Sequence, residues 1–362
     1  MVIANNIQSI TAWKSFRQRP LIIAGPCSAE TEEQMMNTAR QLTETVKVDI
    51  FRAGIWKPRT RPSAFEGVGV KGLKWLKQVK QEFNLPVATE VASEKHVYEA
   101  LKYGIDVLWI GARTSANPFA VQEIADALHG VDVTVLIKNP INPDLELWIG
   151  AIERVHKAGI HTIGVIHRGF SSYEKTQYRN QPKWQMPIEL MRRIPNLPII
   201  CDPSHMAGDA LYLHEIAQKA IDLNFDGLMI ESHIDPAHAW SDAQQQIMPN
   251  ELLELLSRLI MRVPVSNDSK FLDLLGELRA QIDLYDDQLL DLMEQRMKVA
   301  ETIGKYKKEN NITILQASRW DQIIRKAIEK GAKKALSAEF IDKLFKAIHQ
   351  ESINHQMKVM NK

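Results

Sequence analysis

Only two cysteines, Cys27 and Cys201, occur in the 362 residues, and no apolar run is long enough to span a bilayer. Two cysteines cannot build a disulfide framework, and the first 20 residues contain no apolar core of signal-peptide length. The 45 basic side chains are offset by 44 acidic ones, so there is no net field to hold nucleic acid or an anionic membrane. These absences predict a cytoplasmic protein that binds neither nucleic acid nor membrane.

Glycine and proline are scarce in the last hundred residues. Of the 16 prolines 15 lie at or before Pro249, and 14 of the 17 glycines lie at or before Gly227. Both residues interrupt helices, so this distribution predicts a loop-rich domain over residues 1–262 and a long-helix domain over residues 270–362. Residues 263–269 (VPVSNDS) form the predicted linker.

Short apolar runs alternate with helical patterns in the first domain, which is typical of parallel strands joined by crossover helices. The runs cover residues 21–24, 50–53, 87–89, 107–110, 133–137, 162–166, 198–201 and 227–230. This number of strands, without a GxGxxG turn, favours a (β/α)8 TIM barrel over an open doubly wound sheet. In such a barrel, functional side chains follow the carboxyl ends of the strands.

Cationic side chains follow several of the predicted strands. They are Arg52, Lys57, Arg59, Arg113, Lys138 and Arg168. Any one of them alone is best interpreted as a surface loop residue. Together at one barrel mouth they would repel one another unless an anion of several charges lay among them, and arginine suits phosphate and carboxylate.

A second set of strand-end residues combines one thiol, one imidazole and two carboxylates. These residues are Cys27, His205, Glu231 and Asp242. Structural zinc prefers Cys and His alone, whereas this mixture suits a catalytic divalent ion such as Mn, Fe, Co or Zn with an open position. Each residue also has a structural interpretation that needs no metal. Cys27 can be a small buried side chain, His205 can pair with Asp202, and Glu231 and Asp242 can be carboxylates at helix starts. Cys201 is assigned to the core.

The residues at these strand ends resemble a known enzyme family. The motifs are AGPCS (24–28), RAGIWKPRT (52–60), IGART (110–114), HRG (167–169), DPSH (202–205) and DGLMIESHIDP (226–236) followed by SD (241–242). They resemble the type I beta branch of the 3-deoxy-D-arabino-heptulosonate 7-phosphate (DAHP) synthases over residues 20–249. The segment KPRT (57–60) separates this branch from the related octulosonate 8-phosphate synthases.

The resemblance implies a metal-dependent condensation of phosphoenolpyruvate with erythrose 4-phosphate. The metal, with Mn the first choice and Fe, Co or Zn the others, would be bound by Cys27, His205, Glu231 and Asp242. The implied phosphoenolpyruvate residues are Arg113, Lys138 and Arg168 at the phosphate, with Arg52 and Lys57 near the carboxylate. Arg59 and Thr60 would bind the phosphate of erythrose 4-phosphate. Lys57 is the candidate proton donor to the aldehyde oxygen, with simple anion binding as its alternative role.

The last hundred residues carry an apolar seam. Its members recur at alternating three- and four-residue spacing over residues 271–306, which predicts one long helix that packs against partner helices. Arg296 occupies a seam position and is a functional candidate, or else a residue that snorkels at the rim. Lys307 shares its face, whereas Arg279 lies about 100° away around the helix. Further helices are predicted over residues 319–330 and 337–359, and dimerisation through the long helix is expected.

This segment resembles the all-helical chorismate mutases. The matching motifs are LxxLRxxID (275–283), LLxLMxxR (289–296) and GxxK (304–307). The resemblance implies a cofactor-free rearrangement of chorismate to prephenate, with Arg296 and Arg319 on the carboxylates and Lys307 and Gln356 on the ether oxygen. Ser352 would support the site, and Arg279 would reach the pocket of the partner subunit. The family has acids where this chain has Gln316 and Trp320.

Two hypotheses follow from the resemblances, and a third makes no use of them. The first is a bifunctional enzyme, DAHP synthase and chorismate mutase, that forms a homodimer or a larger assembly and is inhibited by prephenate through the helical domain. In the second, the synthase carries a catalytically weak helical domain that senses chorismate or prephenate. The third is a phosphate-binding scaffold without catalysis, which requires no metal.

Overall fold

The computed structural model describes all residues except 1–6, 14–15, 17, 59–63, 174–175 and 362. The chain forms two compact units, Met1–Pro264 and Val265–Lys362. Within the described residues, no helix has the length and apolar character that a membrane crossing requires.

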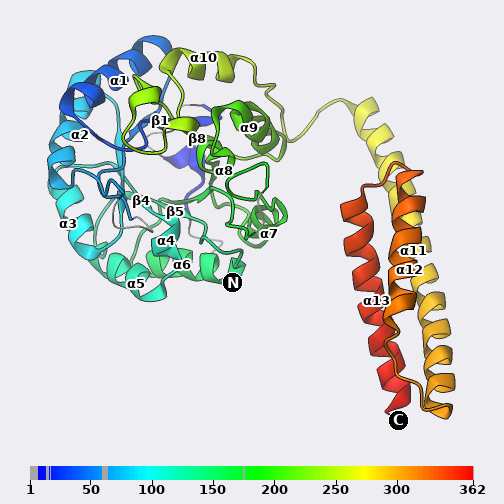
Figure 1. The fold of residues 1–362 in the computed structure, drawn as a ribbon. Coiled ribbons are helices and arrows are strands. Elements are labelled where there is room, and N and C mark those ends of the chain that lie inside the picture. Colours follow the sequence, from blue (N-terminus) through cyan, green and yellow to red (C-terminus); the bar gives the residue numbers. More distant parts are fainter. Residues whose placement is uncertain (1–6, 14–15, 17, 59–63, 174–175, 362) are drawn as a thin grey trace. The chain divides into compact units, whose positions relative to one another are not determined.

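The first unit is a closed barrel of parallel strands that pair in chain order (Figure 1). The strands are β1 (Leu21–Gly25), β2 (Ile50–Arg52), β3 (Val87–Val91), β4 (Val107–Ile110), β5 (Thr134–Lys138), β6 (Ile163–His167), β7 (Ile199–Cys201) and β8 (Gly227–Glu231). β8 closes the barrel on β1, with Leu21 opposite Gly227 and Gly25 opposite Glu231. The predicted TIM barrel and all eight of its strands are confirmed.

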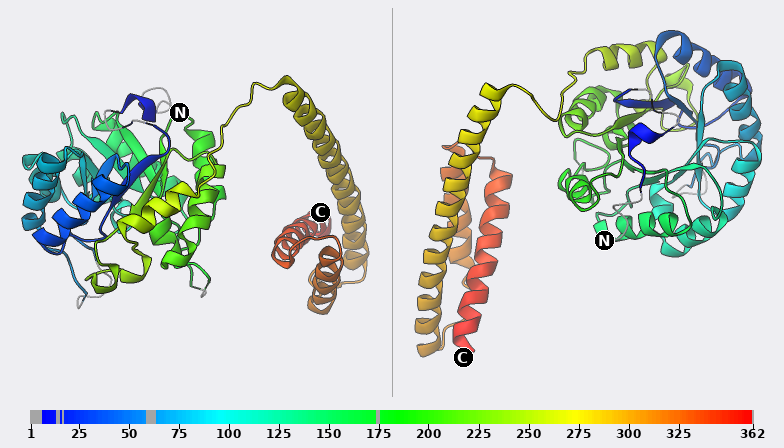
Figure 2. Two further views of the ribbon diagram at one scale, coloured as in Figure 1. Left: turned by 90° about the horizontal axis from the view of Figure 1, so that it is seen from above. Right: turned by 180° about the vertical axis from the view of Figure 1, so that it is seen from behind.

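Helices surround the barrel and cover the outer faces of its strands (Figures 1 and 2). They are α1 (Glu32–Thr45), α2 (Val70–Phe83), α3 (Glu94–Lys102), α4 (Ala112–Ser115), α5 (Pro118–Ala127), α6 (Leu145–Lys157), α7 (Gln185–Arg193), α8 (Pro203–Ala207), α9 (Leu213–Asp222) and α10 (Pro249–Ser257). Polar side chains cap several of these helices: Thr31 accepts from the Gln34 amide at the start of α1, and Asp144 accepts from the Leu147 amide at the start of α6. Short 3-10 turns complete the unit: η2 (Ile10–Ala12), η3 (Ala210–Tyr212), η4 (Pro236–His238) and η5 (Ala243–Gln245).

The barrel interior is filled by its own apolar layer. Trp109, Leu136, Ile166 and their neighbours are fully buried in it, and Trp13 from the N-terminal segment packs against the same cluster. Strands buried on both faces read as continuous apolar runs, which is why the sequence pattern revealed them. The polar residues follow the carboxyl ends of the strands, as a barrel requires.

The second unit contains the helices α11 (Ser269–Glu309), α12 (Ala317–Ala332) and α13 (Ala338–Met360). α13 runs beside α11, and α12 packs on α13 (Figure 1). Ser337 caps α13 by accepting from the Phe340 amide, as predicted. Few side chains are buried here, and the seam residues Ile282 and Leu289 are 57% and 54% exposed. One copy of this unit therefore leaves much of its apolar surface uncovered.

Two candidate active sites

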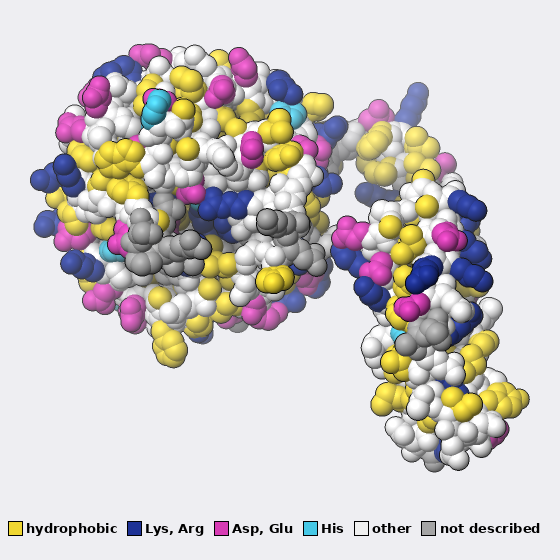
Figure 3. Space-filling view, in the orientation of Figure 1, with side chains coloured by type: hydrophobic (Ala, Val, Ile, Leu, Met, Phe, Trp, Pro, Cys, Tyr) yellow, Lys and Arg dark blue, Asp and Glu magenta, His cyan; other side chains and the backbone are white. Residues whose placement is uncertain are grey.

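A cavity of about 320 Å³ opens beyond the carboxyl ends of the strands. The predicted site residues that line it are Lys57, Arg113, Arg168, His205 and Asp242. Figure 3 shows Lys and Arg side chains gathered in the central hollow of the barrel unit. The strand-end rule therefore located the cavity and five of its lining side chains. The predicted residues Arg59 and Thr60 lie outside the described part of the chain.

Two of the predicted cations, Arg52 and Lys138, are buried and are not among the residues that line the cavity. Arg52 donates from Nη1 to Glu231 Oε1 and from Nη2 to the Cys27 carbonyl, at 3.0 Å each. Lys138 Nζ lies 2.8 Å from Asp202 Oδ2. Both cations also lie over the Trp109 ring, at 4.8 and 5.9 Å from its centroid. Ion pairs and a shared aromatic face thus hold them.

Three guanidinium groups crowd the cavity wall. Burial, together with the nearby cations Arg179 and Arg113, lowers the pKa of Arg168 to about 10 against the opposing effect of Asp202. Mutual repulsion of this kind favours binding of an anion with more than one charge. The wall therefore has the electrostatic character of a phosphate site.

Arg179 was missed at the sequence level. It lines the cavity and donates from Nη1 to Asp242 Oδ1 and to Gln245 Oε1, at 2.8 Å each. It lies in the loop after β6, well beyond the residues that directly follow the strand. Only the path of that loop, which sequence periodicity does not report, brings it to the cavity.

The four predicted metal ligands converge from the ends of β1, β7 and β8. Cys27 Sγ lies 3.3 Å from Asp242 Oδ2, and His205 Nε2 lies 3.7 Å from Glu231 Oε1. Burial raises the pKa of the Cys27 thiol to about 12, with Glu231 adding to the effect. The thiol is therefore protonated at neutral pH unless a bound cation displaces its proton.

The surroundings of His205 suit a metal ligand. Its Nδ1 lies 2.8 Å from Asp202 Oδ2, so Nε2 faces Glu231. Burial lowers the pKa of His205, although Asp202 opposes the effect, and the ring is accordingly neutral at pH 7. A carboxylate behind a neutral histidine is the usual arrangement that fixes the ligand nitrogen.

Within the described residues, no set of three or more Cys, His, Asp or Glu side chains already has the arrangement of a metal site. Cations contact the candidate ligands instead: Lys57 Nζ lies 2.9 Å from Cys27 Sγ, and Arg179 contacts Asp242. The donors nevertheless fit a divalent ion, because a thiol, a neutral imidazole and two carboxylates lie in pairs within 3.7 Å.

The helical unit has its own cavity of about 450 Å³ between α11, α12 and α13. It brings together predicted residues from all three helices, namely Arg296, Lys307, Arg319, Ser352 and Gln356. Arg296 donates to the Ser352 hydroxyl, and Lys307 Nζ donates to the Ile314 carbonyl at 2.5 Å. Burial lowers the pKa of Arg296. Gly304 permits the close approach of α13 here, since a Cβ would meet Gln356 Cα at 3.1 Å.

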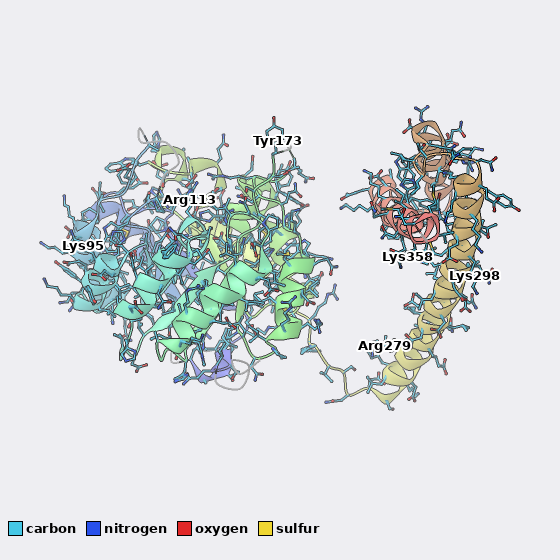
Figure 4. The ribbon with its side chains drawn as sticks, turned by 90° about the horizontal axis from the view of Figure 1, so that it is seen from below. Lys95, Arg113, Tyr173, Arg279, Lys298 and Lys358 are labelled. Atoms are coloured by element: carbon cyan, nitrogen blue, oxygen red, sulfur yellow. The ribbon has the colours of Figure 1, made fainter. Side chains whose placement is uncertain are left out.

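Two further residues of this cavity stand where the resembled family has acids. Gln316 and Trp320 both line it, and Trp320 stacks on His349 with ring centroids 3.9 Å apart. Arg279 is not among the lining residues. It lies on the N-terminal part of α11, away from the segment against which α12 and α13 pack (Figure 4).

The fold and the two cavities define a closed (β/α)8 barrel with cationic side chains at its mouth, joined to a helical domain that has a second cavity lined by cations. The model described as "DAHP synthetase I family" matches residues 9–261, and the model described as "Chorismate mutase type II" matches residues 278–357. The chain belongs to the DAHP synthetase I family and carries a chorismate mutase domain. These matches confirm both resemblances that the sequence motifs carried.

Known relatives agree with this assignment. A phospho-2-dehydro-3-deoxyheptonate aldolase of Thermotoga maritima is 32% identical over 241 residues, covering 66% of this chain and 69% of the relative. A 2-dehydro-3-deoxyphosphooctonate aldolase of Variovorax paradoxus is 27% identical, covering 70% of this chain and 93% of the relative. The crystal structure of the Thermotoga maritima DAHP synthase superposes with a TM-score of 0.58 at 29% identity, covering 70% of this chain and 68% of that one.

Proposed function

We propose that the barrel condenses phosphoenolpyruvate with erythrose 4-phosphate and water to give DAHP and inorganic phosphate. The observation that carries this proposal is the convergence of Lys57, Arg113 and Arg168 with His205 and Asp242 at one cavity. The other two metal-type donors lie buried against these, Cys27 beside Asp242 and Glu231 beside His205. The cations offer sites for the phosphate and carboxylate of phosphoenolpyruvate. Arg113 and Arg168 bind the phosphate from the cavity wall, and the buried Lys138 adds a third positive charge.

A divalent ion, with Mn the first choice, is proposed to bind to Cys27, His205, Glu231 and Asp242. When bound, it supplies Lewis-acid polarisation of the aldehyde oxygen of erythrose 4-phosphate. The enol carbon of phosphoenolpyruvate bonds to the aldehyde carbon, and water adds at the carbon that bears the phosphate. The C–O bond of the resulting hemiketal phosphate then breaks and releases phosphate.

Lys57 is the proposed proton donor to the aldehyde oxygen. Burial opposes its charge, but Cys27 and Glu231 raise its pKa overall, so the ammonium group is present at neutral pH. Its Nζ lies beside Cys27 Sγ, at the proposed metal site. The charge of the buried Arg52 is proposed to favour the phosphoenolpyruvate carboxylate. Arg59 and Thr60 are proposed to bind the phosphate of erythrose 4-phosphate.

The identity of the aldehyde is tested by phosphate release. We expect the full chain to release phosphate from phosphoenolpyruvate with erythrose 4-phosphate and not with arabinose 5-phosphate, the longer sugar used by octulosonate 8-phosphate synthases. Equal rates with the two aldehydes, or release with the longer one alone, would contradict the assignment. The higher identity to the heptulosonate relative supports the expectation.

For the helical unit we propose rearrangement of chorismate to prephenate, without a cofactor. Arg296 and Arg319 bind the two carboxylates, Lys307 and Gln356 contact the ether oxygen, and Ser352 holds Arg296. The cavity favours the compact conformer and stabilises charge on the breaking ether bond. Support comes from the five side chains that line one cavity.

A second role for the helical unit, as a sensor of prephenate or chorismate, is favoured by Gln316 and Trp320, which leave the cavity without acids at those positions. We propose that prephenate bound there inhibits the synthase. The test is the ratio of phosphate-release rates with and without prephenate in the full chain. Arg296→Gln is expected to bring that ratio to one, and an unchanged ratio would contradict the proposal.

We also propose that two copies of the chain pair through α11. The exposed seam residues Leu278, Ile282, Tyr285 and Leu289 offer a continuous apolar stripe, and pairing is expected to carry Arg279 into the pocket of the partner subunit. Ile282→Glu should convert a dimer into a monomer in sedimentation and reduce chorismate conversion. A dimer that survives this change would contradict pairing through the seam.

A further inference from the structure

Two buried glutamines lie behind the proposed metal site. Gln245 and Gln246 follow Asp242 in the segment after β8 and are 1% and 3% exposed, whereas their neighbour Gln244 is exposed. A buried primary amide is costly unless both its nitrogen and its oxygen find partners. The partners of these two side chains show what the amides do.

Gln245 links two of the proposed ligands. Its Nε2 donates to Glu231 Oε2 at 2.7 Å, and its Oε1 accepts from Arg179 Nη1 at 2.8 Å. The same Nη1 donates to Asp242 Oδ1 at 2.8 Å. Since Arg52 occupies Glu231 Oε1, Gln245 completes the orientation of that carboxylate and, through Arg179, also that of Asp242.

Gln246 links the segment after β8 to the one after β1. Its Oε1 accepts from the Cys27 amide, and its Nε2 donates to the carbonyl of Ser241, at 2.8 Å each. Ser241 precedes Asp242, and its hydroxyl lies 2.5 Å from that of Ser28. Gln246 therefore fixes the backbone beside Cys27 and beside Asp242 at once.

The backbone at Asp242 needs such support. Its φ is +49°, in the left-handed region that residues other than glycine seldom occupy. The turn that follows is closed by long backbone hydrogen bonds of 3.3 Å, from the Gln245 N–H to the Asp242 carbonyl and from the Gln246 N–H to the Ala243 carbonyl. The side chains of Gln245 and Gln246 add hydrogen bonds of 2.7 and 2.8 Å from this turn to Glu231 of β8 and to the Cys27 segment.

We propose that Gln245 and Gln246 are positioning residues that set the proposed metal ligands: Gln245 orients the two carboxylates, and Gln246 fixes the Cys27 segment. This inference rests on the metal site of the proposed function. Neither glutamine is proposed to touch the ion. Partners of this kind typically change metal affinity 10- to 100-fold when they are removed.

The test is a Co²⁺ titration of the full chain, followed by its thiolate-to-cobalt absorption and by calorimetry. Gln245→Leu is expected to weaken Co²⁺ binding roughly 10- to 100-fold while the thiolate band remains. Gln246→Leu is expected to weaken or shift that band, because Cys27 moves. Gln244→Leu is the matched control and should bind as the parent does. Gln245→Glu keeps the side-chain size, and a carboxylate against Glu231 should weaken binding despite retained folding.

The outcomes separate this inference from the proposal beneath it. If the parent chain shows no Co²⁺ band that depends on Cys27, the metal site and this inference both fail. If the parent binds Co²⁺ and every Gln245 and Gln246 variant binds with the same affinity and the same band, this inference alone is overturned. Thermal unfolding of the metal-free proteins identifies any variant that is unfolded, and the comparison then rests on the variants that remain folded, of which position 245 offers two.

Discussion

The buried pair between Arg52 and Glu231 offers a test of how the site is held. The two side chains are 1% and 0% exposed. Arg52→Met keeps much of the apolar stem but removes the donors to Glu231 Oε1 and to the Cys27 carbonyl. It also removes the charge over Trp109. Glu231 is then left as a buried carboxylate with fewer compensating groups.

Two estimates set how much free energy of unfolding Arg52→Met should lose. Breaking a buried ion pair typically costs about 3–5 kcal/mol. Alternatively, the buried Glu231 carboxylate becomes neutral by binding a proton. At pH 7 this costs about 3.7 kcal/mol for a group whose pKa in the unfolded chain is about 4.3. Because Lys57 remains near Glu231 and also lowers its pKa, we expect Arg52→Met to lower the free energy of unfolding by about 3 kcal/mol at pH 7.

The loss should depend on pH in a definite direction. In the parent, burial opposes the charge on Glu231, but His205, Arg52 and Lys57 lower its pKa overall. In the variant, the pKa of Glu231 in the folded chain is expected to rise above its value in the unfolded chain. The loss in free energy of unfolding relative to the parent therefore grows as pH rises. At pH 5 the proton costs only about 1 kcal/mol, and the loss should shrink toward that value.

The assay is urea unfolding of the metal-free full chain at pH 5 and pH 7, followed by tryptophan fluorescence. Seven of the eight tryptophans lie in the barrel unit, so the signal reports its unfolding. Arg192→Met, which breaks an exposed pair with Glu189, is the control and should leave the unfolding curve nearly unchanged. A loss below about 1 kcal/mol at pH 7, or an equal loss at both pH values, would refute the reasoning.

Three further predictions concern the two cavities. Gly304→Ala should lower chorismate conversion because the new methyl group meets the α13 backbone at Gln356. Gly276→Ala is the control, since a Cβ there has nothing within 4 Å and should leave conversion unchanged. Equal activities of the two variants would contradict the packing argument. Lys57→Gln should lower kcat of phosphate release about 10²- to 10⁴-fold, whereas a rise in KM alone would make Lys57 a simple anion-binding group. Arg168→Gln should weaken phosphoenolpyruvate binding measured by calorimetry, and unchanged affinity would exclude it from the phosphate site.

The barrel was predictable because its strands are buried on both faces. Runs such as that of β1, where every residue is buried, stand out from the helices without any knowledge of pairing. The strand-end rule then located Lys57, Arg113 and Arg168 at the cavity. It could not distinguish cations that line the cavity from Arg52 and Lys138, because that depends on which carboxylate each one meets.

The residues that sequence reasoning missed lie in loops or take part in hydrogen bonds between distant segments. Arg179 reaches Asp242 across 63 positions, and Gln246 reaches Cys27 across 219. Neither has a periodic pattern or a charge cluster that would single it out. In the helical unit, by contrast, helix geometry alone puts Arg296 and Lys307 of α11 on one face. The family resemblance implied Arg319, Ser352 and Gln356, and all five side chains line one cavity.

The most direct test of the central claim is phosphate release from phosphoenolpyruvate and erythrose 4-phosphate by the full chain, with chorismate loss followed in the same preparation. We expect EDTA to stop phosphate release, added Mn²⁺ to restore it, and chorismate loss to continue in both conditions. Phosphate release that resists EDTA would contradict the metal site. Chorismate that persists while the synthase works would contradict the mutase and leave the helical unit as a sensor.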